Sequence, residues 1–324
     1  VFFAGGHDFG ALWASSRHKG KSIGALSEDV IGKRTRALFM VVIFLVLLMV
    51  NAVFGVVIAG AFVNTPNAVF PAWSAIAVAL VIGQLIHRNV NLTLLSVVGV
   101  TALYFSIYVG SVMPIELPAN MFGLTANANW IIILFIYAAI ASMLPVWVLL
   151  QPRDFINGLQ LFVGLFLLYG AVVLSLPDIS APAFNNNMAE DAPSLVPLLF
   201  VTIACGAVSG FHGIVASGTS SKQLNKETDA RFVGYFAALG EGSLALITIV
   251  AVSGAALAAT PEIWHQIYDK YGSAGAGTFI QGGAQMITNG WGLPIGISTT
   301  LLATMVALFA GTTMDSGVRL QRYI

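Results

Sequence analysis

The chain has 324 residues, of which 57% are hydrophobic and only 9% are charged. Because a soluble globular protein carries about 25% charged residues, a chain of this composition could not cover its surface in water. The formal net charge is zero, which gives no reason to expect a nucleic-acid partner. The composition therefore excludes an ordinary soluble domain and indicates a protein embedded in the lipid bilayer.

Apolar stretches that are long enough to cross a bilayer recur along the whole chain. A helix needs about 20 mostly apolar residues to cross a hydrocarbon core about 30 Å thick. We therefore predict an all-α, polytopic bundle of about nine spans that forms a single transmembrane domain over residues 1–324. The predicted spans are the tail of one in 1–16, then 37–62, 72–87, 91–112, 129–150, 158–177, 194–219, 232–258 and 293–314.

The positive charges predict how these spans are oriented. If the loop at 17–36 is cytoplasmic and each span crosses once, all of the 14 lysines and arginines except Lys270 lie on the cytoplasmic side. The loop at 178–194, on the opposite side, contains none of them. The chain starts at Val1 inside an apolar helix and continues to RLQRYI without a clear stop, so we expect further helices before and after it.

One polar stretch, CGAVSGFHGIVASGTSSK (205–222), lies where an apolar span is expected to continue. Small and polar residues follow one another there at helical spacing, and the glycines disfavour a regular helix. We therefore predict a broken helix over 194–220, with the break near Gly210–Gly213. Since many transporters bind substrate at such breaks, we expect a substrate site there. The alternative is close helix packing around a histidine bonded to a carbonyl. The expected substrate-binding residues are Ser209, Gly210, Phe211, His212, Gly213, Ser217, Gly218 and Thr219.

Four further titratable residues are candidates for ion coupling: His7, Asp8, Glu241 and Asp315. Charges inside a membrane are costly and are usually paired or functional. Structural alternatives remain open for each: Asp8 paired with Arg17 or Lys19, Glu241 in a salt bridge or hydrogen bond, and Asp315 in a gate or an ion pair with Arg319 or Arg322.

Other chemistry finds little support in the sequence. It contains no Walker loop, HExxH motif, paired CxxC motif or GxSxG elbow, and the five histidines show no metal-ligand spacing. We therefore expect neither an enzyme nor a metal or cofactor site.

Three segments together resemble a known family. GGHDFGALWASSRHKGKSIG, then TIACGAVSGFHGIVASGTSSKQL with the following TDARFVGY, and GTTMDSGVRLQRYI are similar in order and separation to the signatures of the carbon starvation protein A (CstA) family. The resemblance implies a bacterial inner-membrane transporter for peptides or, in one branch, pyruvate. It also implies an architecture like that of the amino acid–polyamine–cation superfamily, a LeuT-type inverted repeat with two broken helices, of which this chain would contain the second.

Residues and resemblance together predict a secondary active importer of short peptides or pyruvate-like carboxylates, driven by protons, in the carbon starvation response. His212 and Glu241 are the expected proton sites. Two alternatives are a nutrient receptor that binds without transport and a passive channel.

Overall fold

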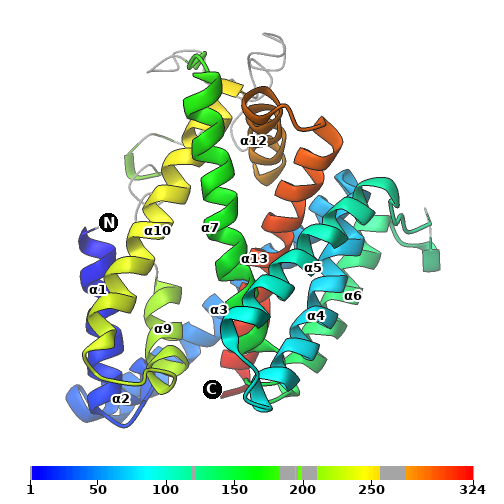
Figure 1. Ribbon diagram of the computed structural model, residues 1–324. Coiled ribbons are helices and arrows are strands. Elements are labelled where there is room, and N and C mark those ends of the chain that lie inside the picture. Colours follow the sequence, from blue (N-terminus) through cyan, green and yellow to red (C-terminus); the bar gives the residue numbers. More distant parts are fainter. Residues whose placement is uncertain are drawn as a thin grey trace. The chain divides into compact units, whose positions relative to one another are not determined.

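The computed structural model describes residues 2–118, 121–181, 194, 196–198, 210–255 and 275–323. Every regular element in this part of the chain is a helix (Figure 1). The α-helices are α1 (Phe2–Arg17), α2 (Ile23–Val30), α3 (Lys33–Asn64), α4 (Val69–His87), α5 (Leu92–Val112), α6 (Ala126–Met143), α7 (Leu150–Ser175), α9 (Gly210–Gly218), α10 (Asp229–Val250), α12 (Ala276–Trp291) and α13 (Ile295–Tyr323). Short helical turns are η1 (Pro66–Ala68), η2 (Met121–Gly123), η3 (Ser220–Lys222) and the π-helical η4 (Ala251–Ala255).

Within the part of the chain that the structure describes, seven helices are long and apolar enough to cross a membrane. They are Lys33–Asn64, Pro66–His87, Leu92–Val112, Ala126–Met143, Leu150–Ser175, Asp229–Gly254 and Ile295–Arg322. These correspond to seven of the predicted spans, and many of their large apolar side chains are exposed. In lipid such exposed faces cost nothing, because the hydrocarbon tails are as apolar as the side chains. The prediction of a polytopic helical membrane protein is therefore confirmed.

Several details of the predicted spans differ from the structure. The span predicted for 129–150 ends at Met143, because Leu144 is extended before Pro145, and a residue before proline avoids the helical conformation. The predicted break near Gly210–Gly213 is wrong, since α9 is continuous from Gly210 to Gly218. The segment at 199–209, which holds the rest of the predicted broken helix, lies outside the described residues.

The other two predicted spans remain unconfirmed. The span at 1–16 corresponds to α1, which has only 16 residues. The span at 194–219 is described as a helix over α9, and only in small part before it. Within the described residues the structure adds two α-helices that the sequence did not predict. One is the short α2, in the loop expected at 17–36, and the other is α12, which packs against α7 and η4.

The chain divides into two compact units. Unit 1 comprises Val1–Met49, Glu190–Leu246 and Leu320–Ile324; unit 2 comprises Val50–Ala189 and Ile247–Arg319. In unit 1, α1 packs against α9 and η3, and α2 also contacts α9. One apolar cluster in this unit is built on Leu12, Ala216 and Ala230, and a second on Ile43, Leu47 and Leu320.

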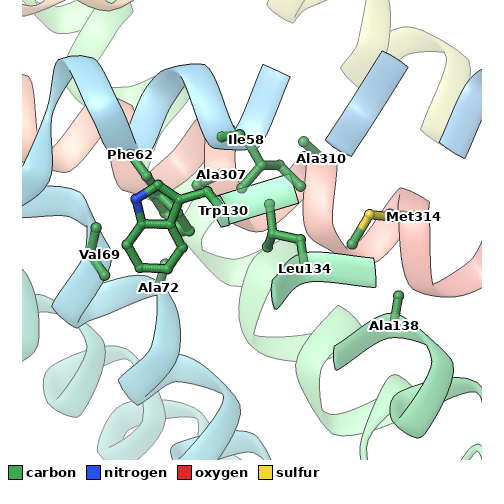
Figure 2. Packing of buried hydrophobic residues seen from close by; sticks show 11 residues of the cluster. Ile58, Phe62, Val69, Ala72, Trp130, Leu134, Ala138, Ala307, Ala310 and Met314 are labelled. Carbon is green, nitrogen blue, oxygen red and sulfur yellow. The ribbon is translucent and has the colours of Figure 1, made fainter. Parts of the chain in front are cut away.

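Unit 2 contains an apolar core to which four helices contribute (Figure 2). Trp130 and Leu134 of α6 lie among small and branched side chains of α3, α4 and α13, and the Trp130 ring packs edge-on against Phe62 at 5.0 Å between ring centroids. The core residues are Ile58, Ala59, Phe62, Val69, Ala72, Trp130, Leu134, Ala138, Ala307, Ala310 and Met314. Alanines where helices meet allow the close approach that membrane helices need in order to associate.

Candidate functional site

Four titratable side chains from three helices of unit 1 form a continuous chain of contacts. His7 and Asp8 come from α1, His212 from α9 and Glu241 from α10. Asp8 Oδ1 lies 3.0 Å from His7 Nδ1, and Asp8 Oδ2 lies 3.2 Å from His212 Nδ1. The other ring nitrogen of His212, Nε2, lies 3.6 Å from Glu241 Oε1. His212 thus connects two carboxylates, and we call these four residues the acid–histidine cluster.

Two glycines allow the helices to approach closely enough to form the cluster. An ideal Cβ on Gly234 of α10 would lie 2.7 Å from the backbone nitrogen of Phe9 on α1, the residue after Asp8. An ideal Cβ on Gly213 would lie 3.0 Å from Cε1 of His7. Because real Cβ atoms almost never approach another heavy atom closer than 3.0 Å, only glycine allows the backbones of α1 and α10 to meet without a shift.

The charges of the cluster constrain one another. Asp8 is nearly buried, with 10% of its side chain exposed, while the other three side chains are 31–41% exposed. An ionised carboxylate in apolar surroundings requires a partner of opposite charge or a proton. An imidazolium at His212 would give both Asp8 and Glu241 such a partner, which is why the histidine occupies the central position.

The structure thus brings together His7, Asp8 and Glu241, which the sequence singled out for ion coupling, and His212, which it assigned to substrate and protons. The alternative in which Asp8 pairs with Arg17 is wrong. Arg17 instead pairs with Glu227, with 2.6 Å between Nε and Oε1, and Asp8 pairs with the two histidines. The proximity of α1, α9 and α10 could not be read from sequence positions more than 200 residues apart.

The remaining residues predicted to bind substrate have varied surroundings. Gly210 is exposed at the start of α9, and Phe211 packs against the apolar cluster of Ile43, Leu47 and Leu320. Gly218 faces Leu320, and the Thr219 amide donates to the carbonyl of Val215. Ser209 lies outside the described residues.

Ser217 is fully buried and is held within a network of serines. Its hydroxyl donates to the Gly213 carbonyl at 2.7 Å and accepts from the Ile23 amide at 3.0 Å. The Ser15 hydroxyl lies 2.6 Å from the Ser217 carbonyl and 2.8 Å from the hydroxyl of Ser221. This network joins the ends of α1 and α9 to η3, and Ser217 therefore contributes to the framework of unit 1.

Asp315 belongs to unit 2 and has its own partners there. It forms a buried ion pair with Arg153, in which each side chain is only 4% exposed. The Tyr137 hydroxyl donates to Asp315 Oδ2 at 2.8 Å and accepts from Arg153 Nη1 at 2.7 Å. Asp315 therefore pairs with Arg153, whereas the ion pair considered from the sequence was with Arg319 or Arg322. Arg319 instead donates to the carbonyls of Ala141 and Leu144 at the end of α6.

The sequence analysis missed Arg153 and Tyr137 as members of a buried polar site. Arg153 was counted only as one of the cytoplasmic charges, but it lies in the first turn of α7 and is buried. No sequence signal pointed to Arg153, because Arg319 and Arg322 follow Asp315 on the same helix and were the expected partners. Among the described residues, no group of three or more His, Cys, Asp or Glu is placed to hold a metal ion.

Comparison with known proteins assigns the chain to a family. The family model described as "Carbon starvation protein CstA" matches residues 1–267. The chain belongs to the CstA family. Its match covers all four residues of the acid–histidine cluster, whereas Asp315 lies beyond it.

The curated relatives are named as transporters. The chain is 34% identical over 298 residues to "Peptide transporter CstA" of Campylobacter jejuni, which covers 89% of this chain and 41% of the relative. It is 37% identical over 256 residues to "Pyruvate/proton symporter BtsT" of Escherichia coli K12, covering 76% and 35%. It is 29% identical over 347 residues to "Peptide transporter CstA" of Bacillus subtilis, covering 98% and 58%. The chain thus spans 35–58% of the length of these three relatives, and no solved structure matches it.

Proposed function

We propose that the chain is the part of a secondary active importer that couples uptake of a small carboxylate-bearing nutrient to a proton. The relatives named as peptide transporters and as a pyruvate/proton symporter support both the substrate class and the coupling ion. The proposal extends to one transporter domain over residues 1–324 in a bacterial inner membrane, active in the carbon starvation response and not an enzyme.

We also propose the LeuT-like inverted repeat and about nine spans for this domain. The seven apolar helices long enough to cross a membrane support a bundle of this kind. The discontinuity that this architecture requires would lie outside Gly210–Gly218, since α9 is continuous there.

The observation that carries the proposal is the chain of contacts through His212. With His212 protonated and His7 neutral, the two carboxylates leave the cluster with a single net negative charge. One further proton, taken by Glu241, makes the cluster neutral. Because a net charge in apolar surroundings is costly, binding of that proton changes the stability of the whole group. A cluster that is neutral with the proton and charged without it has the property that a proton-coupling site needs.

The same cluster offers a place for the carboxylate of a substrate. A substrate carboxylate carries one negative charge, so its entry together with one proton adds no net charge to the site. His212, which is about a third exposed, is the cluster member that lies on α9 and so belongs to the segment predicted to bind substrate. We propose that the substrate lies along this segment, with its carboxylate attracted by the protonated histidine.

Glu241→Gln tests this function because glutamine keeps the shape of the side chain but cannot take a proton. We expect the variant to lose accumulation of substrate driven by a proton gradient in proteoliposomes. Counterflow exchange, which needs no net proton movement, should be retained at least in part. The matched control is Glu227→Gln, which removes a carboxylate that is half-exposed and paired with Arg17.

The outcomes separate the functional classes. Accumulation by Glu241→Gln equal to that of the parent protein would remove Glu241 from the mechanism. Uptake by the parent protein that never exceeds equilibrium would indicate a passive channel, and binding without uptake would indicate a receptor. Labelled pyruvate and labelled di- and tripeptides, offered in parallel, distinguish the two substrate classes.

A further inference from the structure

A cavity of about 450 Å³ lies in unit 1, and none of the four acid–histidine residues lines it. Three lysines contribute to its wall, and apolar side chains of α2, α3, α9 and α13 form much of the rest. Its lining is Lys19, Gly20, Lys21, Ser22, Ile23, Gly24, Met40, Ile43, Ile214, Gly218, Lys222 and Leu320. We call it the lysine cavity. Basic and apolar groups in one cavity fit a ligand that is both anionic and apolar.

The lysine cavity is shaped by an unusual turn after α1. The Gly20 amide donates to the Ser15 carbonyl at 2.8 Å, which closes the end of α1 as in a Schellman motif. In that motif the residue with positive φ is usually glycine, but here it is Lys19, with φ of 58°. Gly20 also has positive φ, and an ideal Cβ on it would lie 2.8 Å from Cγ of Lys222. The turn thus holds Lys19 in a conformation that favours glycine and brings the stem of Lys222 against it.

The serine network described above fixes this turn. Besides its contacts to Ser217 and Ser221, the Ser15 hydroxyl donates to the carbonyl of Lys21 at 2.8 Å. These hydrogen bonds hold the backbone of Lys21, and Ser221 next to Lys222, against the end of α1, so this part of the cavity wall is preformed.

Of the three lysines, only Lys21 has an acidic partner among the described residues. Lys21 pairs with Asp29, with 2.7 Å between Nζ and Oδ2, and this hydrogen bond lowers the pKa of Asp29 below its ordinary value. Within the described residues, Lys19 and Lys222 have no acidic partner within ion-pair distance. The cavity therefore carries a net positive charge at neutral pH.

We propose that the lysine cavity binds the phosphate headgroup of an anionic phospholipid, with part of an acyl chain on the apolar side chains of Met40, Ile43 and Leu320. Loop 17–36 and η3 are predicted to lie at the cytoplasmic surface, and basic residues there attract anionic lipids. A soluble phosphate compound shares the anionic chemistry but has no use for the apolar part of the wall. Lipid binding at this cavity does not require transport activity, so the lipid experiment and the transport experiment can give independent results.

The test measures thermal unfolding of the intact protein in a neutral detergent with three additives. These are phosphatidylglycerol, phosphatidylcholine with the same acyl chains, and glycerol phosphate. A ligand that binds only the folded state raises the melting temperature. We expect phosphatidylglycerol to raise it and the other two to have little effect.

A double variant, Lys19→Gly with Lys222→Met, isolates the charges. Glycine suits the positive φ at position 19, and methionine keeps an apolar stem against Gly20, so we expect the melting temperature without lipid to be retained. The apparent affinity for phosphatidylglycerol should fall by about tenfold or more, because each lysine near a lipid surface contributes appreciably to binding. The matched control, Lys33→Gly with Arg34→Met, removes two exposed charges that lie outside the cavity but in the same predicted loop.

Several results would overturn the proposal. Equal stabilisation by phosphatidylcholine would show that the charges are not recognised, and equal stabilisation by glycerol phosphate would point to a soluble ligand. An equal loss in the control pair would attribute the effect to general surface charge. If the double variant is unstable, native mass spectrometry of the parent protein provides a second test, because it counts the phosphatidylglycerol and phosphatidylcholine molecules that copurify. An excess of phosphatidylglycerol would support the proposal, and equal amounts of the two lipids would contradict it.

Discussion

His212 is the residue on which the candidate site depends, because it contacts carboxylates from two other helices. Without a positive charge on His212, Asp8 and Glu241 would have no cation between them. The same histidine lies on α9, so a substrate that contacts α9 and a proton that binds Glu241 would influence each other through one side chain. Such a linkage would be electrostatic and would need no large movement of the backbone.

The buried pair in unit 2 illustrates how strongly burial changes the importance of an ion pair. Arg153 and Asp315 are almost completely buried, and Tyr137 hydrogen-bonds to both. The Arg36–Glu28 pair, by contrast, lies near the surface, with 45% and 27% of the side chains exposed. Exposed pairs contribute little because water and salt screen them, whereas an orphaned buried charge is severely destabilising.

We therefore expect Arg153→Met to lower the free energy of unfolding by about 3–5 kcal/mol, since it leaves the Asp315 carboxylate buried without its cation. Arg36→Met should change it by about 1 kcal/mol or less. Equilibrium unfolding in mixed micelles measures both. If the two variants lose similar amounts, the Asp315 carboxylate is either protonated or hydrated, and the ion pair is not what stabilises this part of unit 2.

The sequence allowed the titratable residues to be identified but not all of their partners. His7, Asp8, His212, Glu241 and Asp315 were recognisable because charged groups are rare in apolar helices. Their grouping depended on helix contacts between residues far apart in the chain. Arg153 was hidden because a cation near a helix end is normally exposed, and only packing shows that it is buried.

At the scale of helices, the contact between α1 and α10 determines whether the acid–histidine cluster can form. Gly234 lies against the backbone of Phe9, while Gly240, on the same helix, has nothing within 4 Å of its ideal Cβ. The two glycines therefore differ in their surroundings but not in their secondary structure, which makes them a matched pair.

We expect Gly234→Ala to destabilise the protein by about 1–3 kcal/mol, because the new methyl group overlaps with backbone that cannot rotate away. Gly240→Ala should be neutral or stabilising by up to about 1 kcal/mol, since alanine is the better helix former. Unfolding free energies of the two variants should thus change in opposite directions. A loss of equal size in both would mean that α1 and α10 do not meet at Gly234.

Helices could be predicted from the sequence where a long apolar run set their length. They were harder to predict where contacts with other helices determine whether the segment is helical. α12 was missed because AGTFIQGGAQMITNGW contains too many small and polar residues to resemble a span, yet Phe279, Ile280, Ala284, Met286 and Ile287 bury one face of it. The break predicted at Gly210–Gly213 was wrong because glycines in a membrane helix need not interrupt it. Gly213 serves close packing, as the approach of His7 to it shows, while Gly210 is open to its surroundings, and the helix remains continuous over both.

At the scale of the whole molecule, the distribution of charge predicts which end of each helix faces the cytoplasm. The prediction was made without α12, and an additional crossing between α10 and α13 would reverse the orientation of α13. Arg319 and Arg322 would then lie outside the cell, against the positive-inside rule. α12 has 16 residues and is not among the seven described helices that are long and apolar enough to span a membrane, and the predicted orientation counts no crossing for it.

Cysteine labelling tests this orientation at two exposed positions in a Cys205→Ala background. Lys33→Cys lies at the start of α3, in the loop predicted to be cytoplasmic, and Gly296→Cys lies at the start of α13, where an added Cβ meets nothing within 4 Å. A membrane-impermeant maleimide should label position 296 in cells with a permeabilised outer membrane. It should label position 33 only in inverted inner-membrane vesicles. Labelling of both positions from the same side would show that α12 or another segment adds a crossing, and the arrangement of the later charges would need a different explanation.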